Sequence, residues 1–142
     1  MPPRRKQSGF TLIEIVVVVA IIAILAAIVV QQVVGRVDDA QVQRARADIQ
    51  TLGSALNIYR LDNNNYPSTQ QGLDALVHKP SGQPEPRNWK TGGYIERLPK
   101  DPWGNDYRYQ SPGQHGAYDI FTLGRDNQPG GEGVDADIGN WD

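Results

Sequence analysis

Residues 9–34 read GFTLIEIVVVVAIIAILAAIVVQQVV, and this stretch decides the class of fold. The run from Ile15 to Val34 holds twenty residues, of which only Gln31 and Gln32 are polar. As a helix the run is about 30 Å long, which matches the hydrocarbon core of a bilayer. The sequence therefore predicts that residues 10–35 form one membrane-spanning helix.

A short basic leader, MPPRRKQSG at residues 1–9, precedes the apolar run. A secretory signal carries its small-residue cleavage site after the apolar region, whereas here the small residue, Gly9, lies before it. A cut after Gly9 would keep the apolar segment on the mature chain. The positive leader predicts that this end stays in the cytoplasm and that the remainder lies across the inner membrane. A plain signal anchor explains the same charge and hydropathy, so that alternative stays open at this point.

One carboxylate, Glu14, interrupts the start of the apolar run. An unpaired carboxylate near the bilayer centre costs about 2.5 kcal/mol or more, although a place at the cytoplasmic edge lowers that cost. A cut after Gly9 would free the amino group of Phe10, and that cation complements the Glu14 of a neighbouring chain. Such a pair would set the axial register between parallel helices, so Glu14 is a candidate assembly residue.

Apolar residues recur at three- and four-residue steps through residues 36–61, with charged residues between them. The stripe consists of Val37, Ala40, Val42, Ala45, Ile49, Leu52, Leu56 and Tyr59. Its spacing predicts an amphipathic continuation of one helix from Leu12 to about Leu61, about 75 Å long. The DNNN cluster at residues 62–65 is expected to end the helix, because short polar side chains compete for backbone hydrogen bonds.

Residues 62–142 predict a small globular domain. Thr69–His78 has the spacing of a short helix that Lys79-Pro80 would stop. Residues 106–111 and 117–123 alternate apolar and polar side chains across a turn-forming linker, which predicts a β-hairpin. The predicted fold class is α+β: a long N-terminal helix packed on a small antiparallel β-sheet domain.

Three aromatic residues are expected to pack rather than to bind a ligand. Trp103 is predicted to lie in the core beneath the helix. The loop at residues 79–93 has no usable periodicity, and its Trp89 is expected to pack with Tyr94.

The residue inventory argues against an enzyme. The chain has no cysteine, and its two histidines, His78 and His115, lack the spaced partners that a metal site or a catalytic triad needs. The sequence contains no phosphate-binding glycine motif. A formal net charge of -2 without a basic cluster beyond the leader also argues against a nucleic-acid partner.

One stretch points to a definite chemistry, namely LGRDNQPGGEGVDAD at residues 123–137. Calcium takes six to eight hard oxygen ligands from carboxylates and backbone carbonyls in a flexible loop. The spacing is not that of an EF-hand. Taken alone, these residues fit a calcium site and a solvated acidic loop equally well.

The sequence around the leader junction, GFTLIE at residues 9–14, resembles the processing site of type IV pilin-like proteins. Three further motifs resemble the major pseudopilin of the type II secretion system: DNNNYPSTQQGL at 62–73, LPKDPWG at 98–104 and DIGNW at 137–141. The resemblance covers essentially the whole chain. It implies that a prepilin peptidase cuts between Gly9 and Phe10 and methylates the new N-terminal Phe10.

The resemblance also implies a function and a cofactor. The expected protein is the major subunit of a periplasmic pseudopilus that polymerises with itself and drives folded proteins across the outer membrane. Its expected partners are minor pseudopilins, the inner-membrane assembly platform, the prepilin peptidase and, before assembly, membrane lipid. Calcium becomes the favoured occupant of the acidic loop. Its expected ligands are the carboxylates of Asp126 and Asp137, then Asp135, with backbone oxygens of Leu123 and Gln128.

The sequence departs from the family at two positions. Family members commonly carry a glycine and a proline where this chain has Ala23 and Gln31. Both residues here are better helix formers, which removes the local cause of the loosening expected in assembled filaments.

Two alternative functions remain open from the sequence. The first is a type IV pilus subunit that serves adhesion or motility. The second is a membrane-anchored, calcium-dependent binding module that never polymerises.

Overall fold

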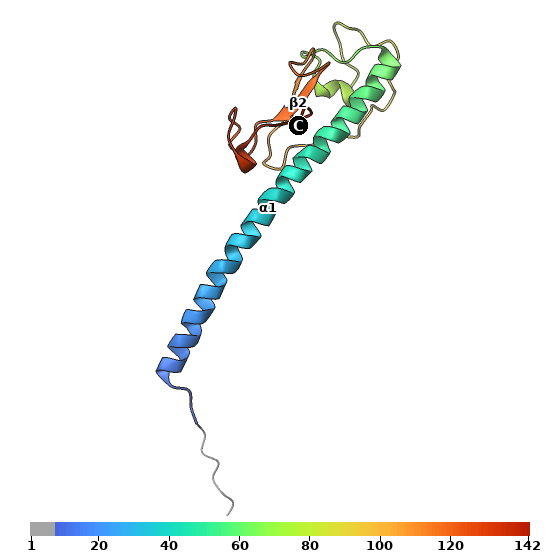
Figure 1. Cartoon of the computed structure of the whole chain (residues 1–142). Coiled ribbons are helices and arrows are strands. Elements are labelled where there is room, and N and C mark those ends of the chain that lie inside the picture. Colours follow the sequence, from blue (N-terminus) through green and yellow to red (C-terminus); the bar gives the residue numbers. More distant parts are fainter. Residues whose placement is uncertain (1–7) are drawn as a thin grey trace, which may run out of the picture. The chain divides into compact units, whose positions relative to one another are not determined.

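The computed structural model describes residues 8–142, and for residues 31–33 it describes the backbone alone. Most of the predicted leader at residues 1–9 therefore lies outside the described residues. The chain divides into two compact units, Met1–Val37 (unit 1) and Asp38–Asp142 (unit 2). One helix, α1 (Leu12–Asn63), begins in unit 1 and ends in unit 2 (Figure 1).

Helix α1 has 52 residues and confirms the prediction of a single long helix from Leu12, with two residues more than predicted at its end. Asn64 follows it in the left-handed conformation, with φ 65°, and its N–H donates to the carbonyl of Arg60 at 2.7 Å. This bond satisfies one of the terminal carbonyls, and Asn adopts the left-handed conformation more readily than most residues. The polar cluster at 62–65 thus ends the helix as predicted.

In unit 2, one face of α1 forms one side of the hydrophobic core. The buried apolar side chains on this face are Ala45, Ile49, Leu52, Ala55, Leu56 and Tyr59. The core residues from the rest of unit 2 include Leu73, Leu76, Tyr107, Ile120 and Ile138. The predicted stripe begins too early along the chain, because Val37 and Ala40 are exposed.

A three-stranded antiparallel sheet lies beside the unit 2 part of α1 (Figure 1). Strand β1 (Arg108–Gln110) pairs with β2 (Asp119–Thr122), and β2 pairs with β3 (Ile138–Gly139). The first pair confirms the predicted hairpin, although both strands are shorter than predicted. Strand β3 was not predicted, because two residues carry no readable alternation of apolar and polar side chains.

The short helix predicted over Thr69–His78 is wrong in extent and type. Only a 3-10 turn, η1 (Leu73–Leu76), forms there. Gly72 precedes it with φ 64°, a conformation that an α-helix cannot include. A second 3-10 turn, η2 (Gly133–Asp135), lies in the acidic stretch.

The predicted packing of Trp89 with Tyr94 is confirmed, whereas the predicted core position of Trp103 is confirmed only in part. The rings of Trp89 and Tyr94 meet edge to face with their centroids 6.2 Å apart, and Trp89 Nε1 donates to the carbonyl of Ala75 at 2.9 Å. Trp103 packs against the core, although it is only partly buried.

Candidate processing, assembly and calcium sites

The predicted cleavage junction lies outside helix α1. Gly9 and Phe10 are exposed and not helical, and the Phe10 side chain is 87% exposed. The first helical residue, Leu12, comes two residues later. The junction between Gly9 and Phe10 is therefore accessible.

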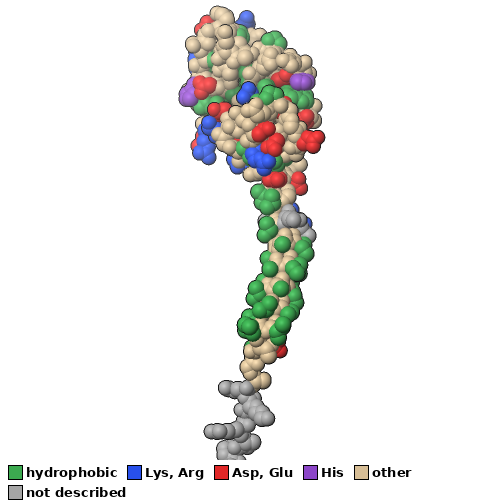
Figure 2. Space-filling view, turned by 90° about the vertical axis from the view of Figure 1, so that its left-hand side faces the viewer, with side chains coloured by type: hydrophobic (Ala, Val, Ile, Leu, Met, Phe, Trp, Pro, Cys, Tyr) green, Lys and Arg blue, Asp and Glu red, His purple; other side chains and the backbone are tan. Residues whose placement is uncertain are grey.

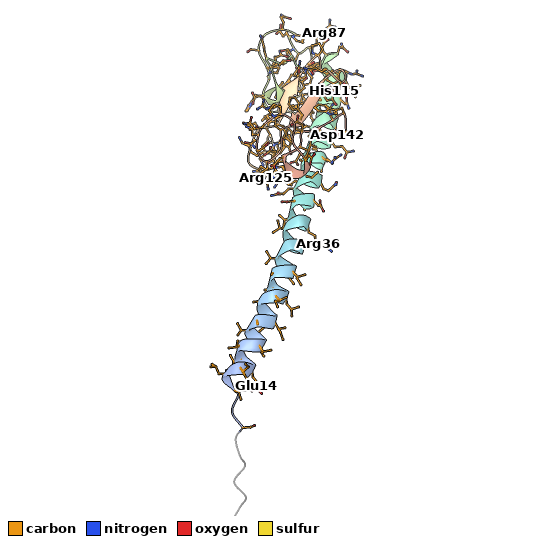
Figure 3. The ribbon with its side chains drawn as sticks, turned by 60° about the vertical axis from the view of Figure 1, so that its left-hand side comes forward. Glu14, Arg36, Arg87, His115, Arg125 and Asp142 are labelled. Atoms are coloured by element: carbon orange, nitrogen blue, oxygen red, sulfur yellow. The ribbon has the colours of Figure 1, made fainter. Side chains whose placement is uncertain are left out.

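Glu14 and Thr11 form a reciprocal pair of hydrogen bonds at the start of α1. The backbone N–H of Thr11 donates to Glu14 Oε2 at 2.8 Å, and the backbone N–H of Glu14 donates to Thr11 Oγ1 at 3.3 Å. This is a capping box, in which two otherwise unsatisfied N–H groups of the first turn are bonded. The T-x-x-E spacing at residues 11–14 is a local signal from which the box could have been predicted. Figure 3 labels Glu14 where α1 begins.

The apolar segment of α1 is covered by no other part of the described chain. Every side chain from Ser8 to Val30 is exposed, and α1 is long and apolar enough to cross a membrane. Figure 2 shows hydrophobic side chains around the unit 1 part of α1. A continuous apolar surface of this size marks a site of contact with lipid or protein. At Ala23 and Gln31, the two departures from the family, the backbone of α1 stays helical.

The acidic stretch at residues 123–137 is a loop in which Arg125 contacts the opposite arm. Its Nε and Nη2 donate to Asp135 Oδ1 and Oδ2, each at 3.0 Å, and its backbone N–H donates to Val134 O at 2.8 Å. The hydrogen bonds that Arg125 donates to Asp135 raise the pKa of Arg125 above its ordinary value. Sequence reasoning missed this pair, because Arg125 and Asp135 are ten residues apart and nothing local joins them.

The close approach of the two arms of this loop needs glycine at position 124. Gly124 has φ 76°, and a Cβ added to it would lie 2.7 Å from Val134 O and 2.9 Å from Ala136 O. Any side chain here would therefore collide with the backbone of the opposite arm.

The candidate calcium ligands differ in the partners that already engage them and in their exposure. Asp126 Oδ1 accepts the backbone N–H of Gln128 at 3.0 Å, and both oxygens of Asp137 accept the N–H of Gly130 at 3.1 Å. Asp135 is instead engaged by Arg125. Leu123 is buried at the end of β2, whereas Gln128 is exposed.

The donor set of the loop suits calcium in its chemistry. Carboxylates and backbone carbonyls are the hard oxygen ligands that calcium takes. Asp126 and Asp137 are bonded only to backbone N–H groups of the described chain, so each retains acceptor capacity. Within residues 8–142, however, no group of three or more His, Cys, Asp or Glu side chains is placed to hold a metal. Any calcium bound here would therefore depend on backbone oxygens for part of its ligand set.

Each histidine is paired with an aspartate four residues away. His78 Nδ1 lies 2.9 Å from Asp74 Oδ1 on the surface. His115 Nδ1 lies 3.0 Å from Asp119 Oδ2, and its ring stacks on Trp141 with centroids 4.0 Å apart. Among the hydrogen bonds described for residues 8–142, neither histidine contacts a hydroxyl group that could act as a nucleophile.

The architecture is that of a type IV pilin-like protein: one long N-terminal helix, apolar in its first half, whose second half packs on a small antiparallel sheet. A crystal structure of the major pseudopilin from the type 2 secretion system of enterohaemorrhagic Escherichia coli is similar, with a TM-score of 0.68 and 54% sequence identity. That similarity covers 76% of this chain and 92% of the other.

The sequence comparisons name the particular family. The family described as "Type II secretion system (T2SS), protein G" matches residues 32–141, and the "Prokaryotic N-terminal methylation motif" matches residues 4–30. The type II secretion system core protein G of Pseudomonas aeruginosa is 59% identical over 98% of both chains. That of Vibrio cholerae is 59% identical over 99% of this chain and 96% of the other. The chain belongs to the type II secretion system protein G family.

Proposed function

We propose that this chain is the major structural subunit of the periplasmic pseudopilus of a type II secretion system. In this role it polymerises and drives folded proteins across the outer membrane. The observation that carries the proposal is the unit 1 part of α1, whose exposed aliphatic surface lies largely within residues 4–30, the range that the methylation motif matches. The relatives at 59% identity over nearly full length support it. The role is structural and requires no catalytic residue of the chain itself.

Processing precedes assembly in this proposal. The chain enters the inner membrane once, with the leader in the cytoplasm and unit 2 in the periplasm. A prepilin peptidase cuts between Gly9 and Phe10, which are exposed and outside the helix, and methylates Phe10. Because the cut removes only residues 1–9, the whole of α1 remains on the mature subunit.

Assembly then exchanges lipid for protein around the apolar half of α1. Parallel copies of residues 10–35 pack their aliphatic side chains against each other. Because lipid tails are equally apolar, this association depends on van der Waals packing and on polar contacts between helices rather than on the hydrophobic effect. The new amino group of Phe10 pairs with Glu14 of a neighbouring copy and sets the axial register. The inner-membrane assembly platform and minor pseudopilins are the other proposed partners.

We further propose that the loop at residues 123–137 binds calcium. The ligands would be the carboxylates of Asp126 and Asp137 and the backbone oxygens of Leu123 and Gln128, with Asp135 as the remaining candidate. A calcium ion bound there would supply a divalent charge that offsets the repulsion among these acids.

Cell fractionation tests the proposed function against its alternatives. In the native strain at normal expression, the chain should occur in the inner membrane and the periplasm, and deletion of its gene should abolish export of secreted proteins. Recovery in sheared surface fibres with export intact would instead support a type IV pilus subunit. Failure of the purified mature chain to cross-link with itself in membranes would support an anchored binding module that does not polymerise.

A further inference from the structure

Arg125 is the last basic residue of the chain, and an acidic stretch follows it. Residues 126–142 contain five acids and no Lys or Arg. These acids are Asp126, Glu132, Asp135, Asp137 and Asp142. Arg125 thus supplies the one positive side chain within the C-terminal loop at residues 123–137.

Arg125 is joined to the opposite arm of the loop in two ways. Its backbone N–H donates to Val134 O at 2.8 Å, and its guanidinium donates through Nε and Nη2 to the two oxygens of Asp135, each at 3.0 Å. The backbone hydrogen bond fixes the position of the Arg125 main chain. The side chain therefore reaches Asp135 from a restrained starting point. A bidentate guanidinium–carboxylate contact is both stronger and more directional than a single bond.

The same contact divides the acids of the loop into two kinds. Both oxygens of Asp135 face a permanently charged cation, and the Asp135 side chain is only 33% exposed. Asp126 and Asp137 contact the backbone N–H groups of Gln128 and Gly130 instead. Calcium would have to share Asp135 with a guanidinium that repels it, whereas no basic side chain in the described contacts lies on Asp126 or Asp137.

We propose that Arg125 is a built-in cation that closes the C-terminal loop without metal and withholds Asp135 from calcium. Asp126 and Asp137 are then the only carboxylate ligands, and backbone oxygens complete the set. The withholding of Asp135 rests on the proposed calcium site. The closing of the loop by Arg125 does not, because it requires no metal. Arg125 is a positioning residue in this role and not a ligand.

The test uses the full-length chain in detergent micelles. All three tryptophans (Trp89, Trp103 and Trp141) lie in unit 2, so tryptophan fluorescence during heating reports the unfolding of unit 2. The variants are Arg125→Gln, Asp135→Asn and the double variant, with Asp137→Asn for comparison. Arg87→Gln is the matched control, because Arg87 is an exposed arginine of unit 2 at the end opposite Arg125 (Figure 3).

The melts in chelator test whether Arg125 closes the loop. Arg125→Gln and Asp135→Asn should each lower the Tm by about 3 °C, as expected for loss of one partly exposed bidentate pair. The double variant should lose little more than either single variant, since both remove the same contact. Arg87→Gln should leave the Tm unchanged. An unchanged Tm for Arg125→Gln would overturn the closing role.

Calorimetric titration with calcium chloride tests whether Asp135 is withheld. Asp135→Asn should change the Kd by less than about threefold, whereas Asp137→Asn should weaken binding by about a hundredfold or more. Arg125→Gln should tighten binding by about fivefold, because a positive charge leaves the loop and Asp135 becomes free.

Two other results of the calcium titration would overturn the withholding of Asp135. Equal weakening by Asp135→Asn and Asp137→Asn would make Asp135 a ligand and overturn the withholding. Absence of binding to the unsubstituted chain would remove the calcium proposal together with the withholding. The melts in chelator would still decide whether Arg125 closes the loop.

Discussion

Thr11 and Glu14 exchange two hydrogen bonds at the start of α1: the N–H of Thr11 donates to Glu14 Oε2 at 2.8 Å, and the N–H of Glu14 donates to Thr11 Oγ1 at 3.3 Å. The one carboxylate of the apolar segment therefore has a partner within its own chain. Loss of an N-cap interaction costs about 0.5–2 kcal/mol. Glu14 thus serves the helix of the single subunit, besides its proposed role in pairing with a neighbour.

The first prediction concerns processing. Cells that contain the prepilin peptidase should yield a mature chain that begins at methylated Phe10, and cells without it should retain residues 1–9. Intact mass of the membrane-extracted protein measures both states. A mature chain that begins after Val34 would contradict the assembly proposal, because the apolar helix would be missing.

The second prediction separates the two roles of Glu14. Glu14→Gln keeps a side chain that can complete the capping box but removes the negative charge, whereas Glu14→Val removes both. If charge pairing drives assembly, both variants should insert normally and assemble at least about tenfold less. Cross-linking of filaments from membranes measures assembly. Normal assembly of Glu14→Gln together with failure of Glu14→Val would assign the effect to the capping box alone.

The third prediction concerns the proposed calcium site in the loop at residues 123–137. Asp126→Ala and Asp137→Ala should lower the Tm in calcium, abolish its rise on adding calcium and reduce secretion, without affecting membrane insertion. Ligand binding stabilises the folded state by about 2.7 kcal/mol when free calcium is a hundredfold above its Kd. Glu132→Gln is the matched control, since Glu132 is an exposed acid of the same loop outside the proposed ligand set. Identical melts in calcium and in chelator would show that the loop is merely acidic and solvated.

The fourth prediction concerns Asn63, a buried residue at the end of α1. Its Nδ2 donates to Tyr59 O and to Tyr94 Oη, and its Oδ1 accepts the N–H of Asn88 at 2.9 Å. Asn63→Ala should lower the free energy of unfolding of unit 2 by about 2–4 kcal/mol, because buried partners lose their hydrogen bonds.

Denaturant unfolding followed by tryptophan fluorescence measures this change. Asn65→Ala, an exposed neighbour of the same type, should shift the free energy by less than about 0.5 kcal/mol. Similar effects of the two substitutions would show that the Asn63 bonds do not hold the loop.

The fifth prediction concerns acid stability through Asp119, which is buried beside His115. Burial pushes the pKa of Asp119 upward, but hydrogen bonds from the His115 ring and from the N–H groups of Gln114 and His115 outweigh it. The net pKa lies below its ordinary value of 3.8. A lowered folded-state pKa stabilises the folded state above pH 4, and this stabilisation is lost as the pH falls through the folded value.

Melting temperatures between pH 6 and pH 2.5 test this expectation. Asp119→Asn should be less stable than the natural chain at pH 6 and should lose less stability below pH 4. Asp74→Asn serves as the control, because Asp74 and His78 form the corresponding pair on the surface. Parallel curves for Asp119→Asn and the natural chain would refute the role of Asp119.

Features that depend on local order in the chain were predictable. The length and composition of the apolar run predict α1, and the alternation around the PGQHG linker predicts the hairpin of β1 and β2. The end of α1 follows from the chemistry of the polar cluster at 62–65. In each case the relevant residues lie within a few positions of one another, so their spacing carries the information.

Features that depend on distant partners were not predictable. Strand β3 exists because Ile138 and Gly139 pair with β2. The 3-10 turn at residues 73–76 was missed for a local reason, because residue type alone does not show that Gly72 adopts a positive φ. The calcium ligand set was predicted from composition and resemblance, which could not reveal that Arg125 engages Asp135.

By itself, the sequence determined the helix, its membrane-length apolar half, the candidate cleavage junction at Gly9-Phe10 and the acidic character of the C-terminal loop. These are properties of period, length and charge along a continuous segment. The tertiary structure alone decided that Tyr107 donates to Asp48, 59 residues away, that Asn63 holds the loop at Asn88, and which acid of the loop at residues 123–137 faces an arginine. Each of these hydrogen bonds joins residues that only the folded chain places side by side, and no local pattern specifies which partner each side chain meets.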